Sequence, residues 1–279
     1  MPLVHTRELI TPGGAVCAFN VITVEHAEAI AAGAEAAGRP AVLQISENAV
    51  KFHGGQPGPI AAATAAVAAA SSARLSLHLD HVEDETLLRR AHAHGFTSVM
   101  FDASKLPYGD NVKATAEAVR WGHERDIWVE AELGRVGGKA GDAHTPGVRT
   151  DPAEAAAYVA DTGVDALAVA VGSTHAMTDR TAALDHALIA ELREMVPVPL
   201  VLHGSSGVPD AELRRAVAAG MTKINVGTAL NKAFTGAVRA FLEAHPSTTD
   251  PRKYLAPARA AMTETVAGFL RTVAGGNSG

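Results

Sequence analysis

Residues 75–81 read LSLHLDH, a run in which leucines alternate with Ser76, His78 and Asp80. Successive side chains of a β-strand point to opposite faces, so the leucines share one face and the polar residues share the other. The leucines are expected to pack against helices, and the polar residues to point toward an enclosed interior. The stretch therefore predicts a buried strand that ends in Asp80 and His81.

Similar short apolar runs recur along the chain and are separated by alanine-rich segments of helical character. The runs are Ala15–Val21, Ala41–Ser46, Ser98–Ser104, Trp128–Gly134, Ala166–Gly172, Pro199–Gly204 and Lys223–Thr228. Helices are expected at Glu25–Ala37, Glu83–His94, Asp151–Ala160 and Asp210–Ala219, with Gly95 and Gly220 ending two of them.

Eight strands that alternate with helices over about 250 residues predict a single (β/α)₈ barrel spanning residues 1–279. A doubly wound open sheet is the alternative, but it normally has a glycine-rich turn after its first strand, and AFNVITVE has none. The polar stretch of about 135–149 is too long for a simple turn, so we expect a mobile loop over the active site.

The composition excludes several classes of protein. The 279 residues are 47% hydrophobic and 19% charged, which is enough apolar material for a packed core. A net charge of −6 makes nucleic acid an improbable partner, and no apolar run approaches the length of a membrane span. We see no signal peptide, and a single cysteine, Cys17, fits a cytoplasmic location.

Three of the 13 histidines follow predicted strands, at the barrel end where catalytic groups gather. These are His81, His175 and His203, after the third, sixth and seventh strands. Each alone is more typical of a structural or surface residue, but three imidazoles at one end of a barrel favour a catalytic zinc site.

Carboxylates accompany these histidines. Asp80 could orient a metal ligand or donate a proton, although a helix-capping role is the alternative. Glu130 and Glu132 alternate on the fifth strand and can both face inward, which suits either a metal site or a buried ion pair with Lys or Arg. Asp102 ends the fourth strand similarly.

Small residues follow the seventh and eighth strands, each time just before a helix. Gly204–Gly207 read GSSG, and Asn225–Thr228 read NVGT. Backbone N–H groups can approach an anion closely there, and a helix N-terminus adds partial positive charge. The two loops together predict a phosphorylated substrate.

These motifs, with VLQISE, VEAELGRVGG and DPRKYL, resemble the class II ketose-bisphosphate aldolases nearly from end to end. The resemblance implies a zinc barrel that interconverts a ketose phosphate with dihydroxyacetone phosphate (DHAP) and an aldehyde. It implies one Zn²⁺ per subunit, held by His81, His175 and His203 with Glu132 close by, and it allows a monovalent cation. It also implies a homodimer or homotetramer.

Further roles are implied by the same resemblance. Asp80 matches the acid/base that protonates the aldehyde oxygen, Asn20 an asparagine on the floor of the site, and Arg252 an arginine that grips a distal phosphate. The positions that match DHAP contacts are Ser46, Gly204, Ser205, Ser206, Asn225, Val226, Gly227 and Thr228.

The sequence departs from the family pattern at two positions. Ala140 stands where many relatives carry the acid that removes the C3 proton of DHAP, so Asp142, or else His144, is expected to replace it. Ala176 stands where a glycine usually presents its N–H to phosphate, and its methyl group would be tolerated at negative φ.

Three hypotheses follow. The first is a zinc-dependent aldolase for fructose 1,6-bisphosphate. The second is an aldolase for tagatose 1,6-bisphosphate or another ketose 1-phosphate. The third is a sugar-phosphate-binding relative without catalytic activity, for which the alanine at position 140 gives room.

Overall fold

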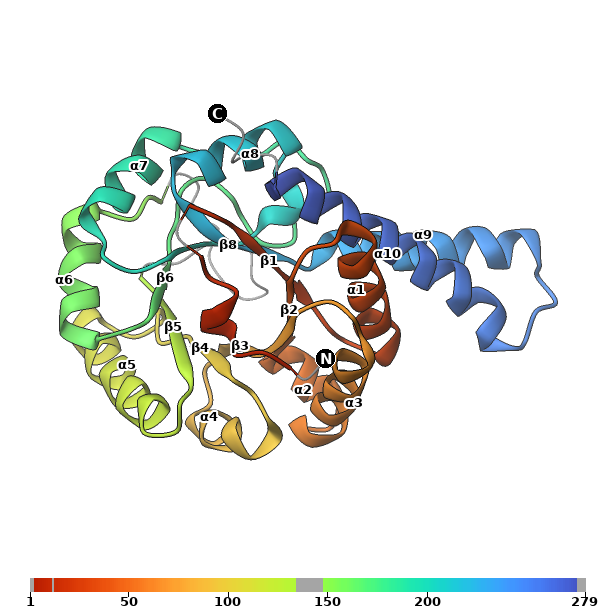
Figure 1. Cartoon of the computed structure of the whole chain (residues 1–279), viewed down its shortest axis with the longest axis horizontal. Helices are drawn as coiled ribbons and strands as arrows, with labels where there is room; N and C mark the ends of the chain where they lie inside the picture. Colours follow the sequence, from red (N-terminus) through yellow and green to blue (C-terminus); the bar gives the residue numbers. More distant parts are fainter. Residues whose placement is uncertain (1–2, 12, 134–147, 275–279) are drawn as a thin grey trace.

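Eight parallel strands close into a barrel in the computed structural model, which describes residues 3–11, 13–133 and 148–274 (Figure 1). Each strand pairs with the next along the chain, and β8 pairs back with β1. The predicted barrel is confirmed, and the open sheet is excluded because the strands leave no edge. The strands are β1 (Val16–Asn20), β2 (Ala41–Ser46), β3 (Leu75–Val82), β4 (Ser98–Phe101), β5 (Trp128–Glu132), β6 (Ala166–Ala168), β7 (Leu200–Leu202) and β8 (Met221–Val226).

Helices surround the barrel, as Figure 1 shows. They are α1 (Val24–Ala37), α2 (Glu47–Phe52), α3 (Pro57–Ala70), α4 (Glu85–Arg90), α5 (Tyr108–His123), α6 (Pro152–Thr162), α7 (His186–Met195), α8 (Asp210–Ala219), α9 (Thr228–Ala244) and α10 (Pro251–Ala274), with 3₁₀ turns η1 (Thr6–Glu8), η2 (His92–His94) and η3 (Ser205–Gly207). In the described part of the chain, every helix is too short or too polar to span a lipid bilayer.

Local signals in the sequence set several helix ends. Asp151 accepts the N–H of Glu154 at the start of α6, and left-handed Gly163 ends that helix. The predicted helix at 83–94 is divided into α4 and η2, and its cap is Asp84, which accepts the N–H of Thr86. A helix-capping role for Asp80 is therefore wrong.

Strand alternation sorts side chains between two layers, as the leucine pattern predicts. Leu75, Leu77 and Leu79 pack in the apolar core, while Ser76 and His78 are buried on the other face of β3. In a barrel of this kind, the inward-pointing side chains form layers along the barrel axis, and the last layer lies at the carboxyl ends of the strands. Position along a strand therefore decides how close an inward side chain lies to the site.

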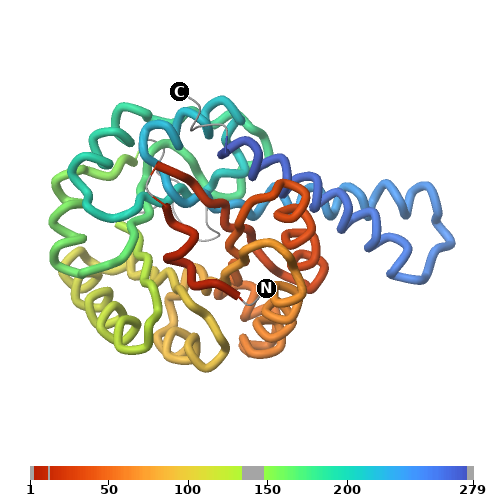
Figure 2. Tube along the Cα trace, viewed as in Figure 1, coloured from red at the N-terminus to blue at the C-terminus, as the bar shows by residue number. Residues whose placement is uncertain are grey.

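The amino-terminal segment covers one end of the barrel, where Figure 2 shows the trace crossing the ring of strands. Val4 donates its N–H to the carbonyl of Leu75, the first residue of β3. Leu9 packs against Val16 and Val42 from the barrel interior. Apolar side chains therefore fill the centre of this end of the barrel.

Helices α9 and α10 form an arm that reaches beyond the ring of helices (Figure 1). The inner part of α10 packs along α1, since an added side-chain carbon on Gly33 would lie 2.6 Å from Val266. Arg252 lies in the first turn of α10, at the outer part of the arm. Its side chain is 88% exposed, and its guanidinium lies 2.8 Å from Asp250.

Candidate metal centre and active site

The backbone at the end of β3 brings Asp80 and His81 to the same cavity, although they are neighbours in sequence. Strict alternation would turn one of them away. The pairing of β3 with β4 shifts between Leu79 and Val82, and His81 adopts φ 50°. A left-handed non-glycine residue is strained, and such strain is typical of functional sites.

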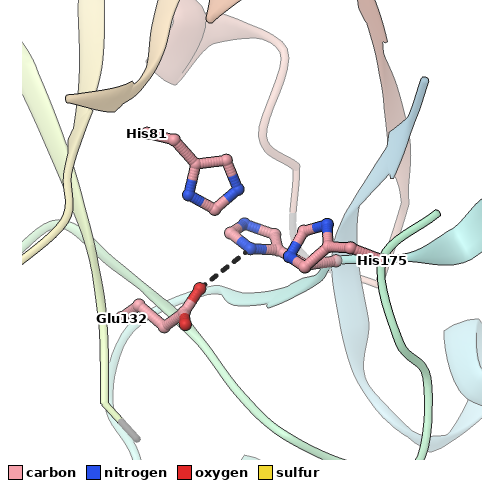
Figure 3. Close-up of side chains that lie close together, drawn as sticks. His81, Glu132 and His175 are labelled. Carbon is pink, nitrogen blue, oxygen red and sulfur yellow. Dashed lines mark hydrogen bonds and ion pairs between the residues drawn. The ribbon is translucent and has the colours of Figure 1, made fainter. Parts of the chain in front are cut away.

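Four side chains converge here: His81, Glu132 and His203 come from the ends of three strands, and His175 comes from the loop after β6. One potential ligand atom from each lies within 4.8 Å of the others. The ring centroid of His81 lies 4.7 Å from that of His203 and 5.2 Å from that of His175. Figure 3 shows His81, His175 and Glu132 turned toward one another, with a dashed line from the carboxylate of Glu132. Three imidazoles and a carboxylate are a donor set that fits Zn²⁺.

Carboxylates lie within hydrogen-bond distance of two of these rings. Oδ2 of Asp102 lies 3.0 Å from Nδ1 of His81. His203 is held on both sides, with Nδ1 3.1 Å from Glu132 and Nε2 3.1 Å from Glu130. Burial alone would lower the pKa of His203, but the two glutamates outweigh it and raise the pKa to about 9.

The two inward glutamates of β5 have different partners. Glu132 joins the four-residue cluster, whereas Glu130 forms a buried ion pair with Lys223, 2.8 Å away. Burial raises the pKa of Glu130, but the neighbouring Lys223 and His203 outweigh it and lower the pKa to about 2. The interpretation as part of a metal site therefore fits Glu132, and the interpretation as a buried ion pair fits Glu130.

Asp80 is almost fully buried at the mouth of the barrel, 3.8 Å from Nε2 of His78. A polar chain continues below it, from Nδ1 of His78 to Ser98 at 2.8 Å and from Ser98 to Thr6 at 2.6 Å. Burial opposes ionisation of Asp80, but His81, His78 and Lys223 outweigh it and hold its pKa well below the usual range. These neighbours therefore keep Asp80 in its ionised form.

A cavity of about 150 Å³ opens beside the histidines. It is lined by most of the residues predicted from the two glycine-containing loops, and by some that were not predicted. Its lining is Asn20, Gln44, Asp80, His81, His175, Ala176, Gly204, Ser206, Asn225, Gly227, Thr228 and Asn231.

A glycine turn and a helix N-terminus border this cavity. The first turn of α9 begins there, and Ser206 accepts the N–H of Ala229 at 3.0 Å. Gly204 has φ 68°, and an added side-chain carbon would lie 2.4 Å from the carbonyl oxygen of Thr174. Only glycine therefore fits this turn.

Two predicted contact residues turn their side chains elsewhere. The hydroxyl of Ser205 donates to the carbonyl of Leu202, and Val226 is buried in the apolar core. Any contact of these residues with a ligand would use the backbone. Ala176 lines the cavity and has φ 59°, so the condition for tolerating its methyl group, a negative φ, is not met and the residue is strained.

Two amides line the cavity with unsatisfied polar atoms. Neither Oδ1 nor Nδ2 of Asn225 has a hydrogen-bond partner among the described residues, and Oε1 of Gln44 has none either. Nε2 of Gln44 donates to Oδ1 of Asn20 at 2.5 Å, so Gln44 fixes the predicted floor residue. Gln44 was not among the predicted site residues, although it shares a strand face with the predicted Ser46.

A second cavity, of about 190 Å³, adjoins the first and shares Asn20, Asp80, His81 and His175 with it. Ser46 lines this second cavity rather than the first. A larger cavity, of about 850 Å³, lies between Pro199 and Met221 at the opposite end of the strands. We place the chemistry at the smaller pair because the titratable groups gather there.

Two other predicted residues stand apart. Arg252 lines neither cavity by the histidines and lies out on the arm. Asp142, like His144 and most of the predicted loop, lies outside the described residues.

Comparison with known proteins gives consistent matches over the whole chain. The family model "Fructose-bisphosphate aldolase class-II" matches residues 8–278. A fructose-bisphosphate aldolase of Geobacillus stearothermophilus is 38% identical over 277 residues, which cover 97% of this chain and 96% of that protein. A probable fructose-bisphosphate aldolase of Bacillus subtilis (strain 168) is 39% identical, with 99% of both chains covered.

The fold of the whole chain also matches that of a solved structure. The crystal structure of the YdjI aldolase from Escherichia coli K12 superposes with a TM-score of 0.83 at 28% identity, covering 100% of this chain and 99% of that one.

Proposed function

This chain belongs to the class-II fructose-bisphosphate aldolase family and is a carbon–carbon lyase, and from that premise we propose that it uses zinc to cleave a ketose phosphate reversibly. Fructose 1,6-bisphosphate is the first candidate, with DHAP and glyceraldehyde 3-phosphate as products. The observation that carries the proposal is the convergence of three histidines and Glu132 beside a cavity that ends at the first turn of α9.

The metal would be held by His81, His175 and His203, with Glu132 close enough to be a fourth ligand. When bound, the divalent ion supplies Lewis-acid stabilisation of the negative charge that develops on the ketose oxygens. Asp102 and Glu130 hold the outer nitrogens of two rings, so the ligand atoms stay aimed inward.

The triose half of the substrate would lie in the first cavity. Its phosphate would meet Gly204, Ser206 and the N-terminus of α9, where backbone N–H groups and the helix dipole favour an anion. The amide of Asn225 offers one donor and one acceptor to the hydroxyl and carbonyl groups of the triose.

Asp80 would transfer the proton of the C4 hydroxyl group. In cleavage its carboxylate takes the proton of the C4 hydroxyl as the C3–C4 bond breaks, and in condensation it returns that proton to the aldehyde oxygen. Asp80 borders both cavities, so it lies between the two halves of the substrate. The residue that exchanges the C3 proton stays a prediction at Asp142 or His144.

Arg252 would reach a distal phosphate only from a second copy of the chain, because it lies in the outer part of the arm. We therefore propose a homodimer or homotetramer in which one copy's arm approaches the other's site. A cytoplasmic location also stays a prediction, which rests on the single, buried cysteine, Cys17.

The test combines metal analysis with a panel of ketose phosphates. We expect cleavage to be lost with a chelator and restored by Zn²⁺ or Co²⁺; full cleavage by metal-free protein would refute the proposal. Relative rates on fructose 1,6-bisphosphate, tagatose 1,6-bisphosphate and ketose 1-phosphates identify the substrate.

The alanine at position 140 stands where relatives carry the acid that removes the C3 proton, so this step needs a test of its own. Exchange of the C3 proton of DHAP with solvent would support the proposed aldolase reaction. DHAP binding without exchange would contradict it and support the third hypothesis, binding without catalysis.

A further inference from the structure

A row of three fully buried groups runs from β8 across the barrel interior to His203, a member of the four-residue cluster. Nζ of Lys223, on β8, lies 2.8 Å from Oε2 of Glu130, on β5. The other carboxylate oxygen of Glu130, Oε1, lies 3.1 Å from Nε2 of His203. All three side chains are 0% exposed.

Glu130 does not meet a substrate directly. It lines neither of the cavities beside the histidines, and it is not one of the four clustered ligands. A buried carboxylate is costly, and the ammonium group of Lys223 offsets that cost. Because Glu130 contacts His203 and lines neither cavity, the pair of Glu130 and Lys223 acts on the site through His203.

The two nitrogens of His203 face different carboxylates. Nε2 lies 3.1 Å from Glu130, which stands outside the cluster and is paired with Lys223, so this side of the ring donates to a carboxylate that stays in place. Nδ1 lies 3.1 Å from Glu132, which is itself a member of the cluster. A cation bound in the cluster would take the place of the proton between Nδ1 and Glu132, whereas the contact between Nε2 and Glu130 would remain.

We propose that Glu130, neutralised by Lys223, is a positioning residue that holds the Nε2–H of His203 and thereby keeps Nδ1 as the atom offered to the metal. The inference rests on the proposed function in one respect, that the four-residue cluster holds a divalent cation.

Asp102 gives an internal comparison. It plays the corresponding part for His81, but it holds Nδ1 of that ring, and its other oxygen accepts the hydroxyl of Ser104 at 2.6 Å. The group that donates to this second oxygen of Asp102 is a neutral hydroxyl, whereas the second oxygen of Glu130 pairs with the ammonium group of Lys223. The barrel thus orients two rings through opposite nitrogens, each with a carboxylate.

Two matched double variants test the hydrogen bond without leaving a buried charge alone. E130M/K223M removes the ion pair and the acceptor for Nε2, whereas E130Q/K223M removes the ion pair but keeps a carbonyl acceptor. Melting of the metal-free proteins shows whether both variants fold. Zinc affinity is then measured by competition with a chromogenic chelator.

We expect the Kd for zinc to rise about 10–100-fold in E130M/K223M and to stay within about threefold of wild type in E130Q/K223M. The visible spectrum of bound Co²⁺ should change in the first variant and be retained in the second. Equal affinities in the wild type and both variants would overturn the inference, and so would equal losses in the two variants.

Nuclear magnetic resonance of the wild type supplies a measurement that needs no variant. In zinc-loaded protein with ¹⁵N-labelled histidine, we expect Nε2 of His203 to carry the proton and Nδ1 to be coordinated. The opposite arrangement would overturn the inference even in an active aldolase. Zinc bound in the expected arrangement by a protein that cleaves no ketose phosphate would refute the proposed function and leave the inference standing.

Discussion

The carboxyl end of the barrel and the α9–α10 arm differ in how their polar residues are held. At the barrel end, His203 is fully buried, and both its ring nitrogens have a carboxylate partner. In the arm, Arg252 is 88% exposed and pairs only with Asp250, two residues before it, among the described residues. The difference fits the proposal that one chain supplies the metal and triose half of the site, and that Arg252 serves the site of another copy.

The largest effect is expected from removing a metal ligand. His175→Ala should abolish stable zinc binding and lower kcat/KM more than about 1000-fold, because the remaining groups cannot stabilise the developing charge. Metal content and cleavage rate measure it. His92→Ala, at an exposed histidine of η2, is the matched control and should change neither. Wild-type zinc content in His175→Ala would contradict the assigned cluster.

The pH dependence of zinc binding should come next in size. The pKa of His203 is raised to about 9 in the metal-free protein, and zinc must displace its Nδ1 proton. The Kd for zinc should therefore fall by up to about tenfold per pH unit between roughly pH 6.5 and 9. Chelator competition at several pH values measures this, and a flat profile would count against the paired imidazolium.

The metal-free protein should become less stable as the pH rises, although its affinity for zinc increases. The folded pKa of His203 lies above its unfolded value of about 6.5. Protonated His203 thus stabilises the fold fully below about pH 6.5, and this contribution is lost as the pH rises through about 9. Thermal melting of metal-free protein checks the sign.

Changing the arm should have a smaller and more selective effect. Arg252→Ala should raise KM for a ketose bisphosphate about tenfold, the loss of roughly one charged contact, and leave KM for a ketose 1-phosphate unchanged. Zinc content and melting temperature should also stay unchanged, since the side chain is exposed. Lys253→Ala, at the neighbouring exposed position, is the control. Equal effects on both substrates would exclude a distal phosphate contact.

The smallest effect is expected at the phosphate end of the cavity. Ala176→Gly relieves a left-handed φ of 59° and should stabilise the protein by about 1 kcal/mol, raising the melting temperature by roughly 2–4 °C. Ala116→Gly, in α5, should instead destabilise the protein, because glycine weakens a helix interior. A lower melting temperature for Ala176→Gly would contradict the strain.

The strands and the polar face of β3 could be predicted from sequence because alternation is a local property of a strand. The place of each histidine after a strand followed from the same pattern. The turn of His81 into the site could not be predicted, since it needs a left-handed backbone and a register shift. The partner of Glu130 was also hidden, because Lys223 is 93 residues away.

The arm and its consequence for Arg252 lay beyond the sequence for another reason. A motif such as DPRKYL says which residues are present but not how far a helix carries them from the barrel axis. The strain at Ala176 was hidden in the same way, because φ is set by the fold around it. Local periodicity thus predicted the buried end of the molecule better than its exposed parts.

The polar chain from Thr6 through Ser98 ends at Nδ1 of His78, and Nε2 of the same ring lies 3.8 Å from Asp80, beyond hydrogen-bond distance. The hydroxyl of Ser98 thus has one partner on the amino-terminal segment and one in the barrel interior. Trimming the chain through Thr6 would remove the first of these partners and leave the second. The amino-terminal segment therefore contributes to holding a ring that packs directly beneath the carboxylate of Asp80.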